Sequence, residues 1–295
     1  MATINTFINR HSVLIYFALT FVISWGGILY VLGPNVMPAK EGEIELLMPL
    51  MYSLFIAGPC IAGILMTILV NGRVGLRDFV SRLFKWRVNV RWYAVALFTT
   101  PLLLMVVLFA LSLISPAFLP RIIATDDKAF LLQFSIIVGL VVSVLEEPGW
   151  TGFAVPTLRL RYGVLTTGLI VGLVWGVRQF LVVYWVAGSS VESLPPAIYF
   201  PVVLLTWMPT YRVLMVWFYD RTASLLVAIL MHASLVTFWT MLTPLTITGV
   251  PLVIYYLAFT IAMWIVIGMI AVANRGQLSA NVRHPSAPHF VGGQP

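Results

Sequence analysis

Long apolar stretches dominate the sequence, and polar residues gather in the short segments between them. Eight stretches are long enough to cross a bilayer, since a membrane-spanning helix needs about 20 mostly apolar residues. They cover residues 12–32, 46–70, 92–114, 131–158, 164–187, 197–219, 224–241 and 252–273. The pattern predicts an all-α fold: a polytopic membrane helix bundle with about eight transmembrane helices.

Composition supports this interpretation, because 61% of the 295 residues are hydrophobic and only 9% are charged. We expect one membrane domain over residues 1–273, in the cell membrane, and a disordered cytoplasmic tail over 274–295, which is polar and rich in Pro and Gly. Stretch 12–32 is long enough to remain as a span rather than act as a cleaved signal peptide. The single Cys60 excludes an internal disulfide and a cysteine-based zinc site.

Basic residues lie mainly on one side of the predicted bundle. Twelve fall in segments of one side: Arg10, Arg73, Arg77, Arg82, Lys85, Arg87, Arg91, Arg159, Arg161, Arg221, Arg275 and Arg283. The opposite segments hold three: Lys40, Arg121 and Lys128. The positive-inside rule therefore predicts that both termini are cytoplasmic. The same distribution explains the net charge of +7 without a nucleic-acid partner.

Residues 71–91 form the most basic of these segments and interleave Leu76, Phe79, Val80 and Phe84 with the charges. This mixture predicts an amphipathic helix that lies at the interface on anionic lipid. Simple anchoring and a regulatory surface are both compatible with it.

Glu146 and Glu147 stand side by side inside the fourth apolar stretch. A charged residue at the bilayer centre costs roughly 2.5–3.5 kcal/mol, so two in a row indicate a protein interior or a wet cavity. Pro148 and Gly149 follow and predict a kinked or broken helix with freed carbonyls. A structural ion pair is the competing interpretation. The bulky Trp150 is suited to wall a cavity.

Four further polar residues lie in the spans: Arg178, Gln179, Arg212 and His232. Counted from the nearest cytoplasmic arginine at ~1.5 Å per residue, Glu146, His232 and Arg212 lie ~20, ~17 and ~14 Å deep, whereas Gln179 lies ~27 Å deep. The first three can share a layer. We expect Arg212 to be a counter-ion of one glutamate, and Arg178 to do the same or to line the extracellular mouth.

Small residues predict where helices approach closely. Gly168, Gly172 and Gly176 repeat every four residues, which is a stripe typical of tight helix contacts in membranes. His232 shares a helix face with Ser224 and Ala228 and is therefore expected at a buried helix contact. A carboxylate beside an imidazole in a partly dry cavity can act as a general base toward water. A hydrogen-bonded core histidine is the alternative for His232.

Three motifs resemble those of the CPBP (CAAX protease and bacteriocin-processing, or Abi) intramembrane endopeptidases. The run from Glu146 to Pro156 resembles the first motif, two glutamates followed by three residues and an arginine. The run from Gly172 to Leu181 resembles the second, an aromatic residue with a histidine four positions later. The run from Asp220 to Ser234 resembles the third, a histidine with an asparagine four positions later. Order and spacing agree over the motif core, residues 131–241.

The resemblance implies roles for the matching residues. Glu146 would activate water, Glu147 would accompany it, and His232 would stabilise the oxyanion. Three positions depart from the motifs: Thr151 replaces the arginine, Gln179 the second-motif histidine and Val236 the asparagine. Gln179 can hold a water molecule but cannot carry a proton. Val236 can donate no hydrogen bond.

The resemblance therefore implies an intramembrane endopeptidase of the CAAX-processing type that hydrolyses a peptide bond of a membrane-associated or prenylated substrate. A catalytically impaired relative that binds such peptides without cleaving them is the alternative, and a transporter is a third. The expected partners are the lipid bilayer and a membrane-associated or lipidated peptide. We expect no cofactor and no zinc, since a catalytic zinc usually needs three protein ligands and the candidates are Glu146, Glu147 and one histidine.

Overall fold

The computed structural model describes residues 2–33, 42–187, 194–245, 247–276 and 278–279, and these residues form helices and connecting turns. In chain order the elements are α1 (Ala2–Arg10), α2 (Ser12–Leu32), α3 (Glu43–Leu83), α4 (Val90–Ser112), η1 (Pro116–Phe118), α5 (Arg121–Ala124), α6 (Lys128–Gly149), η2 (Trp150–Ala154), α7 (Val155–Arg159), α8 (Val164–Arg178), α9 (Phe180–Ala187), α10 (Pro196–Leu205), α11 (Trp207–Thr222), α12 (Leu225–Leu242) and α13 (Gly249–Ala273).

The all-α membrane bundle predicted from the sequence is confirmed. Seven helices of the described chain are long and apolar enough to cross a membrane, and an eighth span results if α8 and α9, which meet at a 40° bend, are taken together. Each predicted stretch coincides with one of these helices or helix pairs. The cytoplasmic location of the termini stays a prediction. Most of the tail, residues 277 and 280–295 with His284 and His289, lies outside the described residues, whereas Leu278 accepts a hydrogen bond from Arg221.

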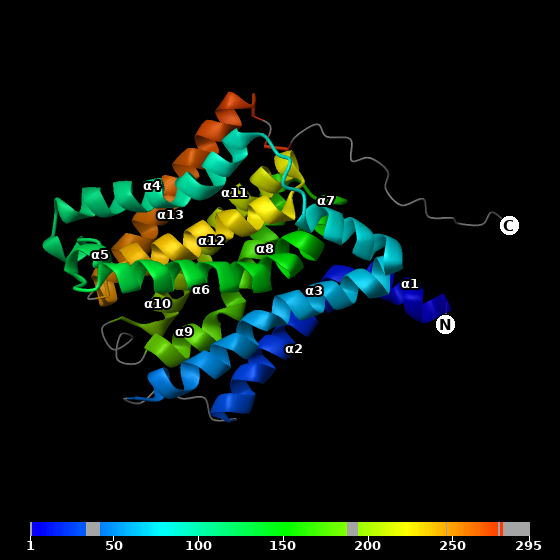
Figure 1. Ribbon diagram of the computed structural model, residues 1–295, viewed down its shortest axis with the longest axis horizontal. Helices are drawn as coiled ribbons and strands as arrows, with labels where there is room; N and C mark the ends of the chain where they lie inside the picture. The colour runs from blue at the N-terminus through cyan, green and yellow to red at the C-terminus, as the bar shows by residue number, and fades with distance from the viewer. Residues whose placement is uncertain (1, 34–41, 188–193, 246, 277, 280–295) are drawn as a thin grey trace.

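The bundle has a central helix and two flanking groups (Figure 1). The span formed by α10 and α11 is 78% buried, against 28% for both α2 and α13, so it lies at the centre. On one side α4, α12 and α6 pack next to one another, and α13 covers α11. On the other side α2 and α3 form a pair that leans against α6 and η2.

The predicted glycine stripe lies where α8 crosses α11. A methyl group on Gly168 would fall 2.5 Å from the Cα of Val213, and one on Gly172 would fall 2.2 Å from the Cα of Pro209. Both distances are far below van der Waals contact, so only glycine permits the observed approach. The stripe therefore brings the backbone of α8, with Trp175 and Arg178 near its end, directly onto α11, which carries Arg212.

Proline gives these helices free carbonyl groups that other helices use. Pro59 lies inside α3 and has no N–H to offer Phe55, four residues earlier. The Phe55 carbonyl accepts instead from the Ser24 hydroxyl of α2, at 2.9 Å. In the same way Pro101 of α4 frees the Leu97 carbonyl, which accepts from Ser234 of α12 at 2.8 Å. Each proline thus creates a hydrogen bond between two helices.

The fourth span is irregular but not broken. Pro148 stands inside α6, after which the chain makes the π turn η2 and continues as α7, so that residues 128–159 form one span. The amide of Trp150 donates to the carbonyls of both Glu146 and Glu147. The helix predicted to kink or break at Pro148 is therefore not broken, and a π turn follows the proline within the same span. Such π turns are frequent at functional sites.

Candidate functional site

The two glutamates lie on the last turn of α6, just before the π turn, and their side chains are completely buried. Successive residues of a helix point about 100° apart. The two carboxylates consequently face different helices, and each meets its own arginine. A buried charge persists only with such a partner, because an isolated carboxylate in a low-dielectric interior is strongly disfavoured.

Glu146 faces α8. Its Oε1 atom forms an ion pair with Nη2 of Arg178, and its Oε2 atom accepts a hydrogen bond from Nε1 of Trp175 at 3.0 Å. Trp175 and Arg178 are three residues apart, so they project from the same face of α8. Both carboxylate oxygens of Glu146 are therefore engaged by donors from a single helix.

Arg178 is itself held by two further helices. Its Nη1 atom donates to the Ser24 hydroxyl of α2 at 3.4 Å and to the Phe55 carbonyl of α3, which Pro59 frees, at 3.3 Å. The guanidinium carbon lies 4.0 Å from the centre of the Phe55 ring, which is a cation–π distance. Arg178 thereby ties α2, α3 and α6 to α8 at one point.

Glu147 faces α11 and α12. Its Oε1 atom accepts a hydrogen bond from Nη1 of Arg212 at 2.8 Å and lies 2.7 Å from Nδ1 of His232. Its Oε2 atom accepts from the Thr151 hydroxyl. The Nδ1 atom of His232 stands off the direction of a well-aligned hydrogen bond. Two bare acceptors would repel at this distance, which favours the tautomer that carries its proton on Nδ1.

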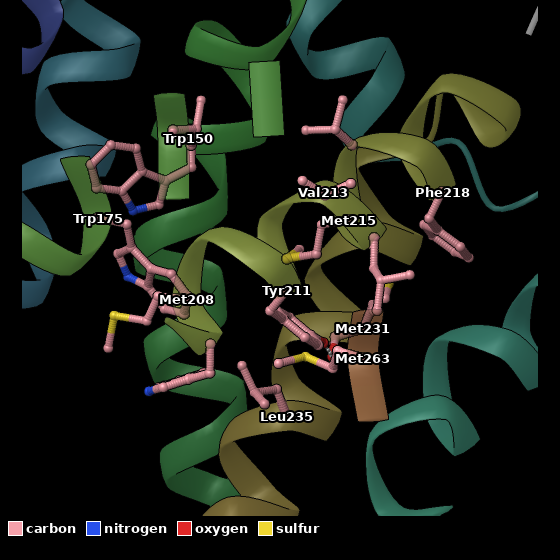
Figure 2. Packing of buried hydrophobic residues seen from close by; sticks show 14 of the residues in the cluster. Trp150, Trp175, Met208, Tyr211, Val213, Met215, Phe218, Met231, Leu235 and Met263 are labelled. Carbon is pink, nitrogen blue, oxygen red and sulfur yellow. Dashed lines mark hydrogen bonds between the residues drawn. The ribbon is translucent and has the colours of Figure 1, made fainter. Parts of the chain in front are cut away.

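Tryptophan rings line the charged cluster. The guanidinium carbon of Arg212 lies 4.4 Å from the ring centre of Trp175 and 5.8 Å from that of Trp150. Arg178 lies 5.7 Å from the Trp150 ring, and the imidazole of His232 meets Trp175 edge to face at 5.5 Å. Figure 2 shows Trp150 and Trp175 in the same region of the core, with Tyr211, Met231 and Met263 in another part of it. The rings exclude lipid and water from the ion pairs.

Some polar atoms of the cluster have no partner among the described residues. They include Nε2 of His232, Nε and Nη2 of Arg212, Nε of Arg178 and Nε1 of Trp150. With Nδ1 protonated, a neutral His232 would present a free lone pair at Nε2, whereas the arginine atoms are donors only. The side of the cluster formed by α11 and α12 therefore keeps unused hydrogen-bonding capacity.

The prediction that an arginine pairs with a glutamate is confirmed for both Arg178 and Arg212. Of the three residues predicted to share a layer, Glu146, Arg212 and His232, the last two both reach Glu147, the neighbour of Glu146 in the chain. Gln179 lies at the bend between α8 and α9, is partly exposed, and makes no side-chain hydrogen bond within the described part of the chain. Val236 packs in an apolar cluster with α2, α3 and α9.

Of the two surroundings that the sequence indicates for the glutamates, a protein interior or a wet cavity, the described residues show the protein interior. Glu146, Glu147 and His232 each have 0% exposed surface, which means that no water-sized space touches their side chains. The reason is the pair of arginines: their guanidinium groups, with Trp150 and Trp175, fill the volume in front of the carboxylates. Trp150, expected to wall a cavity, is packed within the core.

Trp175, Ser24 and the Phe55 carbonyl were not anticipated as members of the site. Trp175 belongs to the second motif, but nothing in its spacing indicates that its N–H binds Glu146. Pro59 could have predicted that the Phe55 carbonyl is free to bind another helix. A proline within a span always leaves the carbonyl four residues earlier without its helical partner. The described residues contain no group of three or more His, Cys, Asp or Glu side chains placed to hold a metal.

The comparisons with known proteins address the same region. Residues 128–238 match the family model described as type II CAAX prenyl endopeptidase Rce1-like. The match runs from the start of α6 into α12, so it includes every ionisable side chain of the cluster. A comparison with curated proteins gave no match. Residues 128–238 therefore form an Rce1-like domain of the type II CAAX prenyl endopeptidase family, the CPBP or Abi family.

Proposed function

We propose that this chain is an impaired member of the CAAX endopeptidase type, which engages a membrane-associated or prenylated peptide but hydrolyses it slowly or not at all. One observation carries the proposal: Arg178 forms an ion pair with the carboxylate of Glu146, and Glu146 is the residue that would activate water. The family match supports the substrate class, and the ion pair supports the impairment.

A general base needs a free lone pair and room for the water whose proton it takes. Both oxygens of Glu146 already accept donors, from Arg178 and Trp175, and the side chain has no exposed surface. Each oxygen of Glu146 keeps a further lone pair, but this arrangement leaves no room beside the carboxylate for a water molecule.

The substitutions at the motif positions act in the same direction. Gln179 cannot carry a proton, and acid–base groups typically contribute roughly 10²–10⁴-fold in rate. Val236 supplies no donor to an oxyanion, and one such donor is typically worth ~10²–10³-fold. The effects need not multiply, because residues that act as a unit are strongly non-additive. Either loss is enough to make turnover slow.

A working peptidase is the second candidate, and the geometry of His232 favours it. Glu147 lies against Nδ1, and Nε2 is buried without a partner. A carboxylate that orients one nitrogen of an imidazole leaves the other nitrogen as a base. In such a reaction Nε2 takes a proton from water while the water oxygen attacks the peptide carbonyl carbon, and the proton then passes to the leaving amine. The site would have to open to admit water and substrate.

The test is a cleavage assay on the full chain in lipid nanodiscs, with a fluorogenic farnesylated peptide that ends in a free carboxylate. We expect the native chain to cleave no faster than Glu146→Gln. The double variant Gln179→His with Val236→Asn should cleave faster. Adding Arg178→Gln, which removes the positive charge but keeps an amide donor for Glu146, should raise the rate again. Arg161→Gln, at an exposed arginine, is the matched control. Binding is measured on the same proteins by cross-linking a photoreactive prenyl peptide.

The two candidates give opposite patterns. Rapid native cleavage that survives Glu146→Gln but disappears in Glu147→Gln and His232→Ala would establish the second candidate. Rapid native cleavage that disappears in Glu146→Gln would show that the Arg178 ion pair does not suppress the base. Cross-linking no stronger than that of an unrelated membrane protein would contradict the peptide-binding part of the proposal.

A further inference from the structure

A basic segment, residues 73–91, comprises the last part of α3, the turn after it and the first two residues of α4. It begins directly after Gly72, whose backbone angles (φ 58°, ψ −148°) break the long helix and set a new direction. Six basic side chains and one acidic side chain lie within it: Arg73, Arg77, Arg82, Lys85, Arg87, Arg91 and Asp78. As predicted from the sequence, its first part is helical, since α3 continues to Leu83.

One face of the basic segment is fastened to the protein. Phe79 is 4% exposed and packs with Leu225 and Ile229 of α12. Arg82 donates to the Gly152 carbonyl in the π turn at 3.1 Å and to the Tyr219 hydroxyl at 2.7 Å. Lys85 donates to the Thr222 carbonyl at 3.0 Å. This face therefore rests on the π turn that follows Glu147 and on the start of the helix that carries His232.

The opposite face is exposed and carries both charge and apolar surface. Arg73, Arg77, Val80 and Phe84 follow one another at spacings of four, three and four residues, so they form one stripe. Phe84 is 69% exposed. Beyond the helix Trp86 is exposed as well, with the Arg87 guanidinium 5.1 Å from its ring centre.

The exposed arginines are not neutralised by the protein. Arg73, Arg77, Arg87 and Arg91 form no ion pair with a carboxylate in the described ranges, and Asp78 pairs with Arg82 on the fastened face. A guanidinium binds a phosphate through two parallel hydrogen bonds. Phe84, Val80 and Trp86 would remain in water against an acidic soluble partner, whereas at a bilayer surface they enter the acyl boundary.

We propose that the exposed face of residues 73–91 binds the phosphate headgroups of anionic lipids. Each basic residue near an anionic membrane surface contributes about 1 kcal/mol, or roughly fivefold in affinity, and four arginines act here together. Lipid bound on this face holds the basic segment against the π turn and α12. Bound anionic lipid therefore stabilises the folded chain by mass action.

The experiment measures thermal unfolding of the purified full chain in a neutral detergent, titrated with phosphatidylglycerol or phosphatidylcholine. We expect phosphatidylglycerol to raise the midpoint by at least about 2 °C and phosphatidylcholine to leave it nearly unchanged. The triple variant Arg73→Gln, Arg77→Gln, Arg87→Gln should lose most of the rise. The charge-matched control, Arg10→Gln, Arg161→Gln, Arg275→Gln, should keep it, since those arginines are exposed elsewhere.

The proposal fails if the two triple variants respond alike, or if phosphatidylcholine gives the same rise. Glycerol phosphate in the same titration separates a lipid surface from a phosphate site: an equal rise from this soluble anion would overturn the lipid assignment. Native mass spectrometry of the unmodified chain gives a second measurement that needs no variant. There phosphatidylglycerol should be retained in preference to phosphatidylcholine, and equal retention would contradict the proposal.

Discussion

The guanidinium of Arg178 contacts the carboxylate of Glu146, and both side chains have no exposed surface. The position next to it, Gln179, is where the family motif has a histidine. Under the proposed function, Gln179 leaves this position without a proton carrier, and Arg178, one residue earlier, places a cation against Glu146. The last turn of α8 therefore supplies both Arg178, which pairs with Glu146, and Gln179, which stands at the motif position.

The Glu146–Arg178 pair should show strong coupling in stability. Arg178→Met leaves a buried carboxylate without its counter-ion, and breaking a buried pair typically costs about 3–5 kcal/mol. Replacing both members, as in Arg178→Met with Glu146→Leu, should recover most of that loss. Unfolding free energies in detergent, measured for the two single variants and the double variant, provide the test. A double variant whose loss equals the sum of the two single losses would show that the pair is not coupled.

A second prediction concerns which position supplies the arginine that pairs with Glu147, position 151 or position 212. Thr151, which donates to Glu147, stands where the family motif has an arginine, and Arg212 supplies the positive charge from α11 instead. Thr151→Arg alone should destabilise the fold by about 3–5 kcal/mol, because it adds an uncompensated buried charge. Adding Arg212→Met removes the competing cation and vacates volume.

The double variant should consequently be more stable than Thr151→Arg alone when both are compared by thermal unfolding. Arg161→Met, combined with Thr151→Arg, serves as the control. Arg161 is exposed, so this substitution removes one positive charge but leaves the space beside Glu147 filled. If Arg161→Met raised the unfolding midpoint of Thr151→Arg as much as Arg212→Met does, net charge alone would explain the gain. That result would contradict the idea that Arg212 and an arginine at position 151 compete for the same place beside Glu147.

Sequence predicted the spans and the close contact at the glycine stripe, because hydrophobic length and small-residue spacing are local properties. It also predicted that arginines would pair with the glutamates, since a buried charge requires a partner wherever the helices lie. Which arginine meets which glutamate depends on the rotation of each helix about its axis, and that rotation is not encoded in periodicity alone.

Counting residues from the membrane surface put Gln179 outside the layer of Glu146, and the same count applied to Arg178 would put it outside too, although Arg178 reaches Glu146. A helical side chain points back toward the N-terminus of its helix, so the long side chain of Arg178 reaches several ångströms below its own Cα. The closed state of the site was likewise beyond sequence reasoning. Whether a polar layer encloses water depends on how completely Trp150, Trp175 and the guanidinium groups fill the space, which is a property of packing.

The contact between α8 and α11 leads to a third prediction. Gly172→Ala would place a methyl group 2.2 Å from the Cα of Pro209, so the helices would have to separate. Overpacking of this kind typically costs 1–3 kcal/mol. Gly268→Ala in α13 is the matched control, since nothing lies within 4 Å of the added methyl group. It should be neutral or stabilise the chain by up to about 1 kcal/mol. Equal unfolding midpoints for the two variants would show that the close approach is not required.

The last prediction tests whether prolines create the hydrogen bonds between helices. Ser234 of α12 donates to the Leu97 carbonyl, which is free because Pro101 has no N–H. Ser234→Ala should cost about 0.6–1.7 kcal/mol, the range of hydrogen bonds between membrane helices. In a Pro101→Ala background the same change should cost less, because the amide of the new residue can bond Leu97 within α4. Unfolding free energies of the two single variants and the double variant give the coupling.

Ser143→Ala is the control. The Ser143 hydroxyl bonds the Gly139 carbonyl of its own helix, so the cost of removing this hydroxyl should not depend on Pro101. A cost of Ser234→Ala that is the same in both backgrounds would mean that the Leu97 carbonyl does not regain a partner, and that the proline is not the cause of the bond.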